Sequence, residues 1–193
     1  MAIVAPILPA HELVSPRLRL RGWQEDDAPP LHEAARESLA SVGRWLPWCH
    51  ADYALANAQA WVAHCQAAWR QGLHYSFAIT DAVDGSLLGG ISLNQRNLLH
   101  RSANLGYWVR QSRQQQGICV EASRLIARFG FTTLELVRIE IVAMSDNWPS
   151  RRVAERSGAR FEGIARQRLI HSGHVQDAAV YGWIPADLTQ SAC

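Results

Sequence analysis

The sequence lacks the features that mark several common classes of protein. It contains neither G-x-G-x-x-G nor G-K-[ST], the glycine-rich patterns that bind dinucleotides and nucleoside triphosphates. No run of basic residues occurs, and the formal net charge of +2 is too small to argue for a nucleic-acid partner. No C-x-x-C pair occurs among its four cysteines, which predicts free thiols in a reducing compartment; they are Cys49, Cys65, Cys119 and Cys193.

Long apolar runs are also absent. None reaches the roughly 20 residues that a membrane-spanning helix needs. Residues 2–9 are apolar, but Pro6 and Pro9 interrupt them and no basic residue precedes them, so they make a poor signal peptide. We therefore expect a cytoplasmic protein that does not bind membranes. A length of 193 residues with 48% apolar residues favours one domain with a sizeable core.

Hydrophobic periodicity predicts one continuous α+β domain, with a mostly antiparallel sheet and helices inserted at a few joints. Asp84-Gly85 is the strongest hairpin signal in the chain. We expect an N-terminal extension over 1–14, the domain over 15–185 and a tail over 186–193. The predicted strands are 17–23, 75–80, 87–93, 103–109, 137–144, 160–171 and 175–183, and the predicted helices are 31–39, 54–69, 120–131 and 150–157.

One informative segment follows the predicted strand 137–144. Asn147 and Ser150 stand at the start of a short helical stretch, and Gly158 ends it. This order suits a strand that ends beside a gap and is followed by a helix whose first turn faces that gap. An Asn-x-x-Ser pattern is also an ordinary helix cap, so both interpretations stay open.

A second segment lies about thirty residues upstream. The strand 103–109 leads into a glutamine-rich loop, Gln114 to Gly117, and then into the helix 120–131. Backbone N–H groups at a helix start lack partners and carry the positive end of the helix dipole, so they attract anions. Gly117 allows the backbone to approach a phosphate closely. The segment predicts either a pyrophosphate site or a plain strand-to-helix connection.

Together the two segments resemble the GNAT superfamily of acetyl-CoA-dependent N-acetyltransferases, in particular its ribosomal-protein-alanine acetyltransferase branch. The family's loop, Q/R-x-x-G-x-G/A, is matched at Gln114, Gly117 and, imperfectly, Cys119, with Glu121-Ala122 after it. Further matches, in the family's order, extend the resemblance from about residue 15 to 183. They are Asn147, Ser150, Val153, Glu155 and Gly158 in the later motif, Ser15 to Arg21, Trp45 to Trp48, and Gly173, Asp177 and Tyr181.

The resemblance implies a fold and a co-substrate site. The two central parallel strands, 103–109 and 137–144, are expected to splay apart and to receive the pantetheine arm of acetyl-CoA. Splayed strands leave buried backbone groups unpaired, at about 1–3 kcal/mol each, and the two amides of pantetheine can pair with them. No metal is expected. The expected cofactor-binding residues are Trp108, Val109, Arg110, Gln114, Gln115, Gln116, Gly117, Ile118, Cys119, Val120, Asn147 and Arg152.

The resemblance also implies acetyl transfer to a primary amine by direct attack in a ternary complex. Ser150 is expected to protonate or stabilise the leaving thiolate, although it could serve only as a helix cap. Many relatives carry a tyrosine acid four residues later, where this chain has Ala154. The general base stays open among Glu33, Glu37, Glu140 and a water chain. The alternation of Glu140 with Arg138 favours a structural ion pair.

The acceptor side is expected near the first helices. Glu33 and Glu37 belong to an acidic stretch that would attract an ammonium group, and Trp45 and Trp48 predict either an aromatic acceptor pocket or simple core packing. The acceptor would be the α-amine of a protein or peptide, or a small amine. His171 and His174 flank a predicted turn and lack a third metal ligand nearby.

Two departures from the family pattern concern the loop. Gln115 stands where the family has its first glycine, and Cys119 where it has a second small residue. A cysteine at a helix start could have a lowered pKa, but no histidine–aspartate arrangement accompanies this one. The altered loop leaves an alternative function open, a catalytically weak protein that binds acyl-CoA and regulates a partner. A homodimer is also possible.

Overall fold

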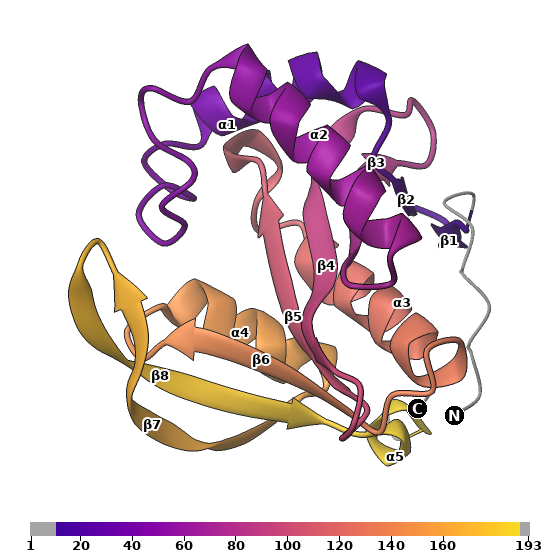
Figure 1. The fold of residues 1–193 in the computed structure, drawn as a ribbon, viewed down its shortest axis with the longest axis vertical. Helices are drawn as coiled ribbons and strands as arrows, with labels where there is room; N and C mark the ends of the chain where they lie inside the picture. Colours follow the sequence, from indigo (N-terminus) through magenta and orange to yellow (C-terminus); the bar gives the residue numbers. More distant parts are fainter. Residues whose placement is uncertain (1–10, 190–193) are drawn as a thin grey trace.

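The computed structural model describes residues 11–189, in which eight strands form one mixed, mostly antiparallel sheet (Figure 1). In sheet order the strands are β1 (Leu13–Val14), β2 (Leu18–Gly22), β3 (Tyr75–Asp81), β4 (Leu87–Asn97), β5 (Ser102–Val109), β6 (Arg138–Met144), β8 (His174–Trp183) and β7 (Arg160–His171). The helices are α1 (Ala28–Glu37), α2 (Leu55–Arg70), α3 (Ile118–Thr132), α4 (Trp148–Ser157) and α5 (Pro185–Thr189), with 3₁₀ turns at Glu25–Asp27 and Gln111–Arg113.

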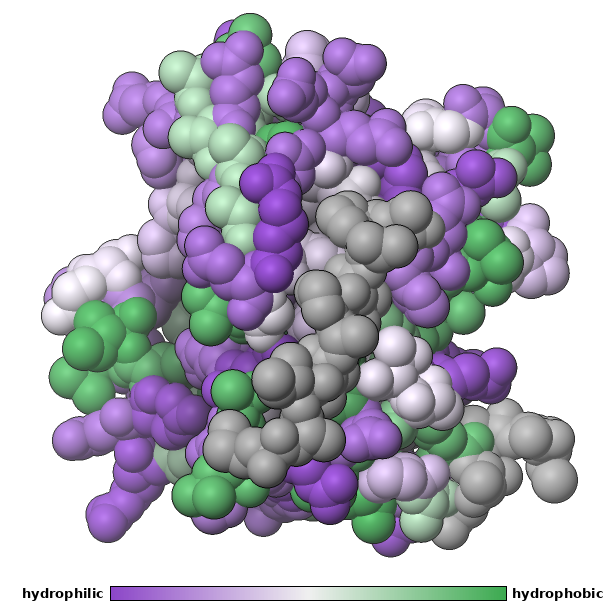
Figure 2. All heavy atoms as spheres, turned by 45° about the vertical axis from the view of Figure 1, so that its right-hand side comes forward, coloured by the Kyte–Doolittle hydropathy of each residue, from purple (hydrophilic) through white to green (hydrophobic). Residues whose placement is uncertain are grey.

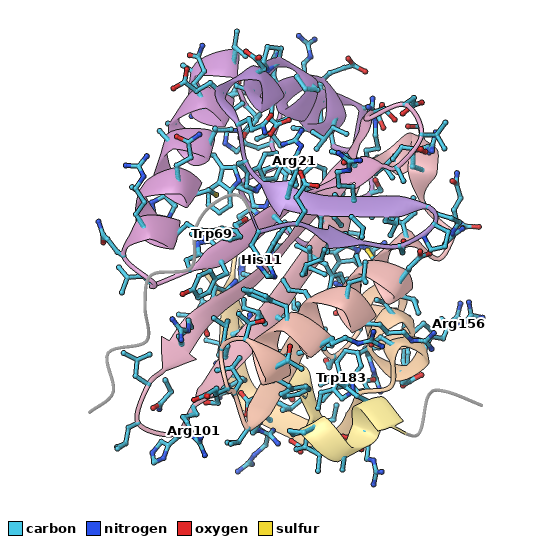
Figure 3. All side chains as sticks on the ribbon, turned by 90° about the vertical axis from the view of Figure 1, so that its right-hand side faces the viewer. His11, Arg21, Trp69, Arg101, Arg156 and Trp183 are labelled. Atoms are coloured by element: carbon cyan, nitrogen blue, oxygen red, sulfur yellow. The ribbon has the colours of Figure 1, made fainter. Side chains whose placement is uncertain are left out.

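The two faces of the sheet carry two separate cores. Successive side chains of a strand point to opposite faces, so Phe77 packs on the α3 side and Ala78 on the α1 and α2 side. Helix α3 crosses the first face, as Figure 3 shows, and it places Phe129 against Phe77 at 5.5 Å between ring centroids.

Strands β5 and β6 form the one parallel pair in the described sheet, and they separate after a short contact. Only Ser102 to Asn104 of β5 pair with Arg138 to Glu140 of β6. Beyond these three pairs, residues 105–109 and 141–144 have no partner across the gap, which opens toward the carboxyl ends of both strands. The predicted splay between the two central strands is confirmed, and so is the predicted α+β fold.

Helix α4 is fixed to the sheet by a cluster behind it. The Tyr181 hydroxyl of β8 donates to Glu155 at 2.9 Å and accepts from Arg151 at 3.1 Å. Arg151 also donates to the Ser145 carbonyl at 2.8 Å. These bonds hold the helix that follows β6 at a defined angle, and they account structurally for Glu155 and Tyr181, two positions that the sequence motifs singled out.

The beginning of α3 is tied to the N-terminal strands in a similar way. Glu121 accepts hydrogen bonds from Ser15 at 2.5 Å and from the Arg17 Nε at 2.9 Å. The motif at Ser15 to Arg21 and the loop motif that includes Glu121 lie about a hundred residues apart in sequence. They therefore meet at the Glu121 carboxylate. Strand β1 lies within the segment predicted as an extension, and α5 continues past residue 185.

Most predicted elements agree with the structure, including β7, whose bounds match the predicted strand. The sequence analysis missed β1, α5 and the last four residues of β4, where the alternation of apolar residues is lost. On the face shown in Figure 2, hydrophilic side chains dominate and apolar ones form small separate groups. Within residues 11–189, no helix combines the length and the apolar character needed to cross a bilayer. Residues 2–9 and Cys193 lie outside the described residues.

Candidate active site

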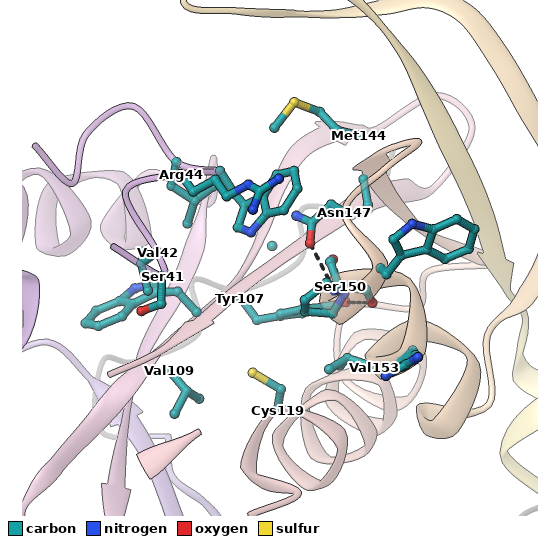
Figure 4. A pocket seen from close by; sticks show the side chains of 18 of the residues that line it. Ser41, Val42, Arg44, Tyr107, Val109, Cys119, Met144, Asn147, Ser150 and Val153 are labelled. Atoms are coloured by element: carbon teal, nitrogen blue, oxygen red, sulfur yellow. Dashed lines mark hydrogen bonds between the residues drawn. The ribbon is translucent and has the colours of Figure 1, made fainter. Parts of the chain in front are cut away.

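A cleft of about 1080 Å³ opens where β5 and β6 diverge (Figure 4). Its walls come from four parts of the chain: the segment after α1, strand β5 with the start of α3, strand β6 with the start of α4, and the end of β7. Twelve residues of the predicted site line it together. They are Trp45, Trp108, Val109, Gln114, Gln115, Gly117, Ile118, Cys119, Val120, Asn147, Ser150 and Arg152.

One end of the cleft is formed by the N-terminus of α3. Gly117 caps this helix in the left-handed region, at φ 77°, which a residue without Cβ adopts at little cost. The first hydrogen bond of the helix runs from Glu121 N–H to the Gly117 carbonyl, so the N–H groups of Ile118, Cys119 and Val120 have no partner within the helix. This end of the cleft suits an anion.

The loop before α3 reaches this geometry with one strained residue. Gln115 has φ 62°, in the region that favours glycine, at the position where the sequence analysis noted a missing glycine. The Gln114 amide instead closes the loop by donating to the Val109 carbonyl at 3.0 Å and to the Ser41 hydroxyl at 3.2 Å. Gln116 does not line the cleft; its carbonyl accepts from Arg17.

The lips of the cleft are unpaired strand edges. Arg110 donates its N–H to Leu88 of β4, so the residues in the same register, including Trp108, also direct their backbone groups to β4. The backbone of Tyr107 and Val109 therefore faces the cleft. The expectation that Trp108 and Arg110 offer their backbone to a cofactor is wrong for this reason. Val109 is the predicted residue that keeps this role, through its N–H, because its carbonyl accepts from Gln114.

The facing lip follows the same alternation. Ser145 donates its N–H to the carbonyl of Asp177 in β8, so the backbone of Val142 and the N–H of Met144 face the cleft, while the Met144 carbonyl accepts from the Asn147 N–H at 2.9 Å. An extended chain that carries amides could pair with both lips.

Ser150 occupies the third position of α4 and points into the cleft. Asn147 caps the helix, because its Oδ1 accepts from the Ser150 N–H at 3.1 Å. The cap is thus the Asn147 side chain, which leaves the Ser150 hydroxyl free for other partners. Ala154, one turn later, is completely buried and offers no acid.

The Ser150 hydroxyl contacts Tyr107, a residue to which the sequence patterns assigned no role. The Tyr107 Oη lies 2.9 Å from the Ser150 carbonyl oxygen and 3.1 Å from its Oγ. Burial raises the pKa of the Tyr107 hydroxyl above its ordinary value. Tyr107 alternates with Val109 along β5, and this period of two was the signal that could have placed it in the cleft.

The charged residues of the lining are mostly basic. Arg44, Arg113, Arg152 and Arg156 line the cleft, while Asp146 is the one carboxylate among the described lining residues. Arg113 pairs with Asp81 at 2.8 Å. Arg156 extends outward from α4 (Figure 3). This balance favours a polyanion at the α3 end.

Cys119 faces the same cleft (Figure 4). Burial raises the pKa of its thiol to about 12, so the thiol stays protonated near neutral pH. The lowered pKa considered for a cysteine at a helix start is therefore wrong, because desolvation outweighs the helix dipole here.

Glu33 and Glu37, expected on the acceptor side, do not line the cleft. Arg110 donates to Glu33 at 2.7 Å and to both oxygens of Glu37 at 2.6 and 2.9 Å, and Ser112 donates its hydroxyl to Glu37 at 2.8 Å. We call these four residues the Arg110 cluster. The bonds from Arg110 lower the pKa of Glu37 to about 2, so this carboxylate neither attracts an ammonium group nor accepts a proton near neutral pH.

The other two acceptor-side candidates differ in position. Trp45 lines the cleft together with Leu46 and Pro47, whereas Trp48 packs edge-on against Trp108 at 5.3 Å and stays behind the wall. Glu140 bonds to Arg138 at 3.0 Å, as the ion-pair interpretation expected. His171 lines the far side of the cleft at the end of β7, a position that its predicted turn did not reveal.

Comparisons with known proteins agree with this geometry. Residues 17–160 match the model of the acetyltransferase (GNAT) domain family. The chain is 31% identical over 170 residues to a Bacillus subtilis protein provisionally named ribosomal N-acetyltransferase YdaF, which covers 87% of this chain and 91% of that protein. It is 27% identical to the ribosomal-protein-serine acetyltransferase of Escherichia coli, over 89% of this chain and 94% of that one.

The fold is similar to that of solved acetyltransferase structures. RimJ of Mycobacterium smegmatis, solved in complex with a coenzyme A disulfide, superposes with a TM-score of 0.86 at 26% identity, over 95% of this chain and 91% of that chain. The family match spans most of the chain and includes both motifs, the splayed strands and all of the cleft lining except residues 169–171. The chain therefore belongs to the acetyltransferase (GNAT) domain family and is an N-acetyltransferase.

Proposed function

We propose that this protein transfers the acetyl group of acetyl-CoA to a primary amine by direct attack in a ternary complex. The observation that carries the proposal is the cleft itself, which joins a helix N-terminus, two unpaired strand edges and the Ser150 hydroxyl in one opening. An acyl donor with a charged tail, an amide-containing arm and a reactive thioester needs these three features in this order.

The α3 end of the cleft fits the pyrophosphate of coenzyme A. The free N–H groups of residues 118–120 supply the donors, and Arg152 and Arg156 add positive charge. The backbone of Tyr107 and the N–H of Val109 on one lip, and the backbone of Val142 and the N–H of Met144 on the other, suit the two amides of the pantetheine arm. Acetyl-CoA supplies the activated acetyl group.

Ser150 is the residue that we assign to the leaving group. During the reaction the amine nitrogen bonds to the thioester carbon, the C–S bond breaks, and the sulfur leaves with the electron pair. The Ser150 hydroxyl donates a hydrogen bond to that sulfur as its charge develops, and the proton that the amine loses balances the thiolate. Of the base candidates that the sequence offered, Glu33, Glu37 and Glu140 do not line the cleft, so we assign the base to water.

The acceptor class is the α-amine of a protein or peptide, or a small amine. Relatives named for ribosomal-protein acetylation support a peptide N-terminus. The acceptor end has an aromatic and basic wall, with Trp45 beside Arg44, in place of the acidic patch that the sequence suggested. Such a wall favours an acceptor with apolar or acidic residues next to its amine.

The test is a panel of peptides and small amines, assayed by steady-state release of free thiol and by mass spectrometry of the products. The sequence contains no lysine, so the enzyme contributes no lysine side chain to the acetylation background. We expect turnover with at least one acceptor class. We also expect Ser150→Ala to lower kcat by about 100-fold, the usual range for a general acid.

A matched control is Ser157→Ala, at the other end of α4. The Ser157 hydroxyl bonds to the Ala154 carbonyl at 2.8 Å and does not line the cleft, so this variant should keep kcat while losing some stability. Tight binding of coenzyme A without turnover on any amine, and without an effect of Ser150→Ala on binding, would contradict the proposal. That outcome would favour the alternative of a regulatory protein that binds acyl-CoA.

A further inference from the structure

We propose that Tyr107 is a positioning residue that turns the Ser150 hydroxyl proton toward the leaving sulfur. The inference rests on the proposed function and names a residue that neither the sequence motifs nor the comparisons assign. The two residues come from opposite walls of the cleft, Tyr107 from β5 and Ser150 from α4, and they meet inside it (Figure 4).

The contact is bidentate. The Tyr107 Oη lies within hydrogen-bond distance of both the Ser150 carbonyl oxygen, at 2.9 Å, and the Ser150 Oγ, at 3.1 Å. A carbonyl oxygen can only accept, whereas a serine hydroxyl can donate or accept. A tyrosine hydroxyl has a single proton, so the pair has two arrangements.

In the first arrangement Tyr107 donates to the carbonyl, and the Ser150 hydroxyl donates to the Tyr107 oxygen. The serine proton then points at the tyrosine and is unavailable to the cleft. In the second arrangement Tyr107 donates to the Ser150 Oγ. The serine proton is then free to point into the cleft, where the sulfur would lie. The direction of the tyrosine proton thus decides whether Ser150 can act as a donor.

The change between the two arrangements costs little, because the Ser150 carbonyl keeps a partner. It lies in the first turn of α4, which spans Trp148–Ser157, so the N–H of residue 154 donates to it within the helix. Losing the tyrosine proton therefore leaves no unpaired buried carbonyl. A developing thiolate favours the second arrangement, since a charged acceptor strengthens a hydrogen bond.

Tyr107 keeps its own proton throughout. Burial raises the pKa of its hydroxyl above the ordinary value, so a tyrosinate would be costly. The thiolate is neutralised by the proton that the attacking amine loses, relayed through Ser150 and water. Tyr107 is therefore unchanged at the end of the reaction, and the protons and charges balance.

The first experiment is a double-mutant cycle with Tyr107→Phe and Ser150→Ala, which removes one hydroxyl at a time and keeps the ring. We expect Tyr107→Phe to lower kcat about tenfold, the effect of one hydrogen bond, while the KM for acetyl-CoA changes less than about twofold. In the Ser150→Ala background the same substitution should change nothing, because Tyr107 acts through the serine.

Tyr75→Phe is the control for losing a tyrosine hydroxyl from the core. Tyr75 is buried against Trp69 and Phe129 and does not line the cleft, so the Tyr75→Phe variant should have the kcat of the wild type. If Tyr107→Phe lowers kcat by the same factor with and without Ser150, or matches Tyr75→Phe, the inference is overturned.

A second experiment does not depend on turnover. Coenzyme A bound to the wild-type protein should have a lowered thiol pKa, because Ser150 donates to its thiolate. Titration by ultraviolet absorbance, with the ligand-free protein as blank, should show that Tyr107→Phe and Ser150→Ala each raise the midpoint by about one pH unit, and that the double variant raises it no further.

The two proposals can therefore fail separately. Wild-type protein that binds coenzyme A, lowers its thiol pKa through both residues and yet acetylates no amine would contradict the proposed function but support the Tyr107 inference. Turnover by the wild-type protein, together with a thiol pKa that Tyr107→Phe leaves unchanged, would support the proposed function but contradict the Tyr107 inference.

Discussion

The close approach of β4 and β5 at Gly89 gives a sharp prediction about the lip of the cleft. A Cβ placed on Gly89 would lie 2.2 Å from the Trp108 carbonyl oxygen and 2.9 Å from the Val109 Cα. Both are backbone atoms of the strand that forms the lip, so Gly89→Ala must push β4 and β5 apart by about 1 Å. Overpacking of this kind costs about 1–3 kcal/mol.

Gly106 provides the matched control on the neighbouring strand. A Cβ there would meet the Asn94 side chain at 3.5 Å and the Ser92 hydroxyl at 3.8 Å, both ordinary contacts. Replacing a strand glycine with alanine gains about 0.5–1 kcal/mol when the space allows it. We therefore expect Gly106→Ala to be as stable as the wild type or slightly more so, and Gly89→Ala to be less stable by about 1–2 kcal/mol.

Urea unfolding measures both variants, with the slope m checked for constancy. At this chain length, 1 kcal/mol corresponds to a Tm change of about 2–4 °C. Calorimetry should also show weaker binding of coenzyme A by Gly89→Ala, because the displaced strand carries Val109. Equal stability and equal affinity in the two variants would refute the argument that backbone contact at Gly89 sets the position of this lip.

Three further predictions concern the loop, the Arg110 cluster and ligand binding. Glu37→Gln should lower stability at pH 7 by about 1–2 kcal/mol, since its carboxylate is only 28% exposed. The pKa of Glu37 is lowered from 4.5 to about 2, so this stability is present above pH 4.5 and is lost as pH falls toward 2. A difference between the two proteins that persists at pH 2 would contradict this cause. Gln115→Gly should stabilise the fold by up to about 1 kcal/mol in urea, because φ 62° strains any residue with a Cβ; a loss of stability would show that the Gln115 side chain contributes more than the strain costs. Coenzyme A at 100 times its Kd should raise Tm by about 5–10 °C in differential scanning calorimetry, and no shift would indicate that it does not bind the folded protein.

Local sequence patterns predicted most elements, because most of the strands and helices have an apolar period that the sequence shows. The strand 160–171 matches β7 at both ends, where turn residues bound the run. The end of β4 escaped, since residues 94–97 are polar and pair with β5 through a register shift. Strand β1 is too short for any period to be visible.

The sequence predicted site residues well where their role depends on local backbone conformation. It predicted them less well where their role depends on contacts between charged side chains far apart in sequence. Gly117 and Asn147 have local conformations that their residue types favour, so their positions followed from the sequence. Arg110 meets Glu37 across 73 positions of sequence, and no local pattern indicates such a pair. The acidic stretch therefore suggested an acceptor patch that the fold neutralises.

The Arg110 cluster has a consequence for how the two substrates influence each other. The cluster binds the end of α1, which precedes the Trp45 wall, to the segment that precedes the α3 loop. The Gln111 N–H adds a second contact between these parts by donating to the Ser38 hydroxyl at 3.0 Å. If the proposed function holds, we expect a shift of the wall on acceptor entry to alter the α3 end of the cleft through these contacts. Thermodynamic reciprocity then requires that the donor alter acceptor affinity by the same factor as the acceptor alters donor affinity.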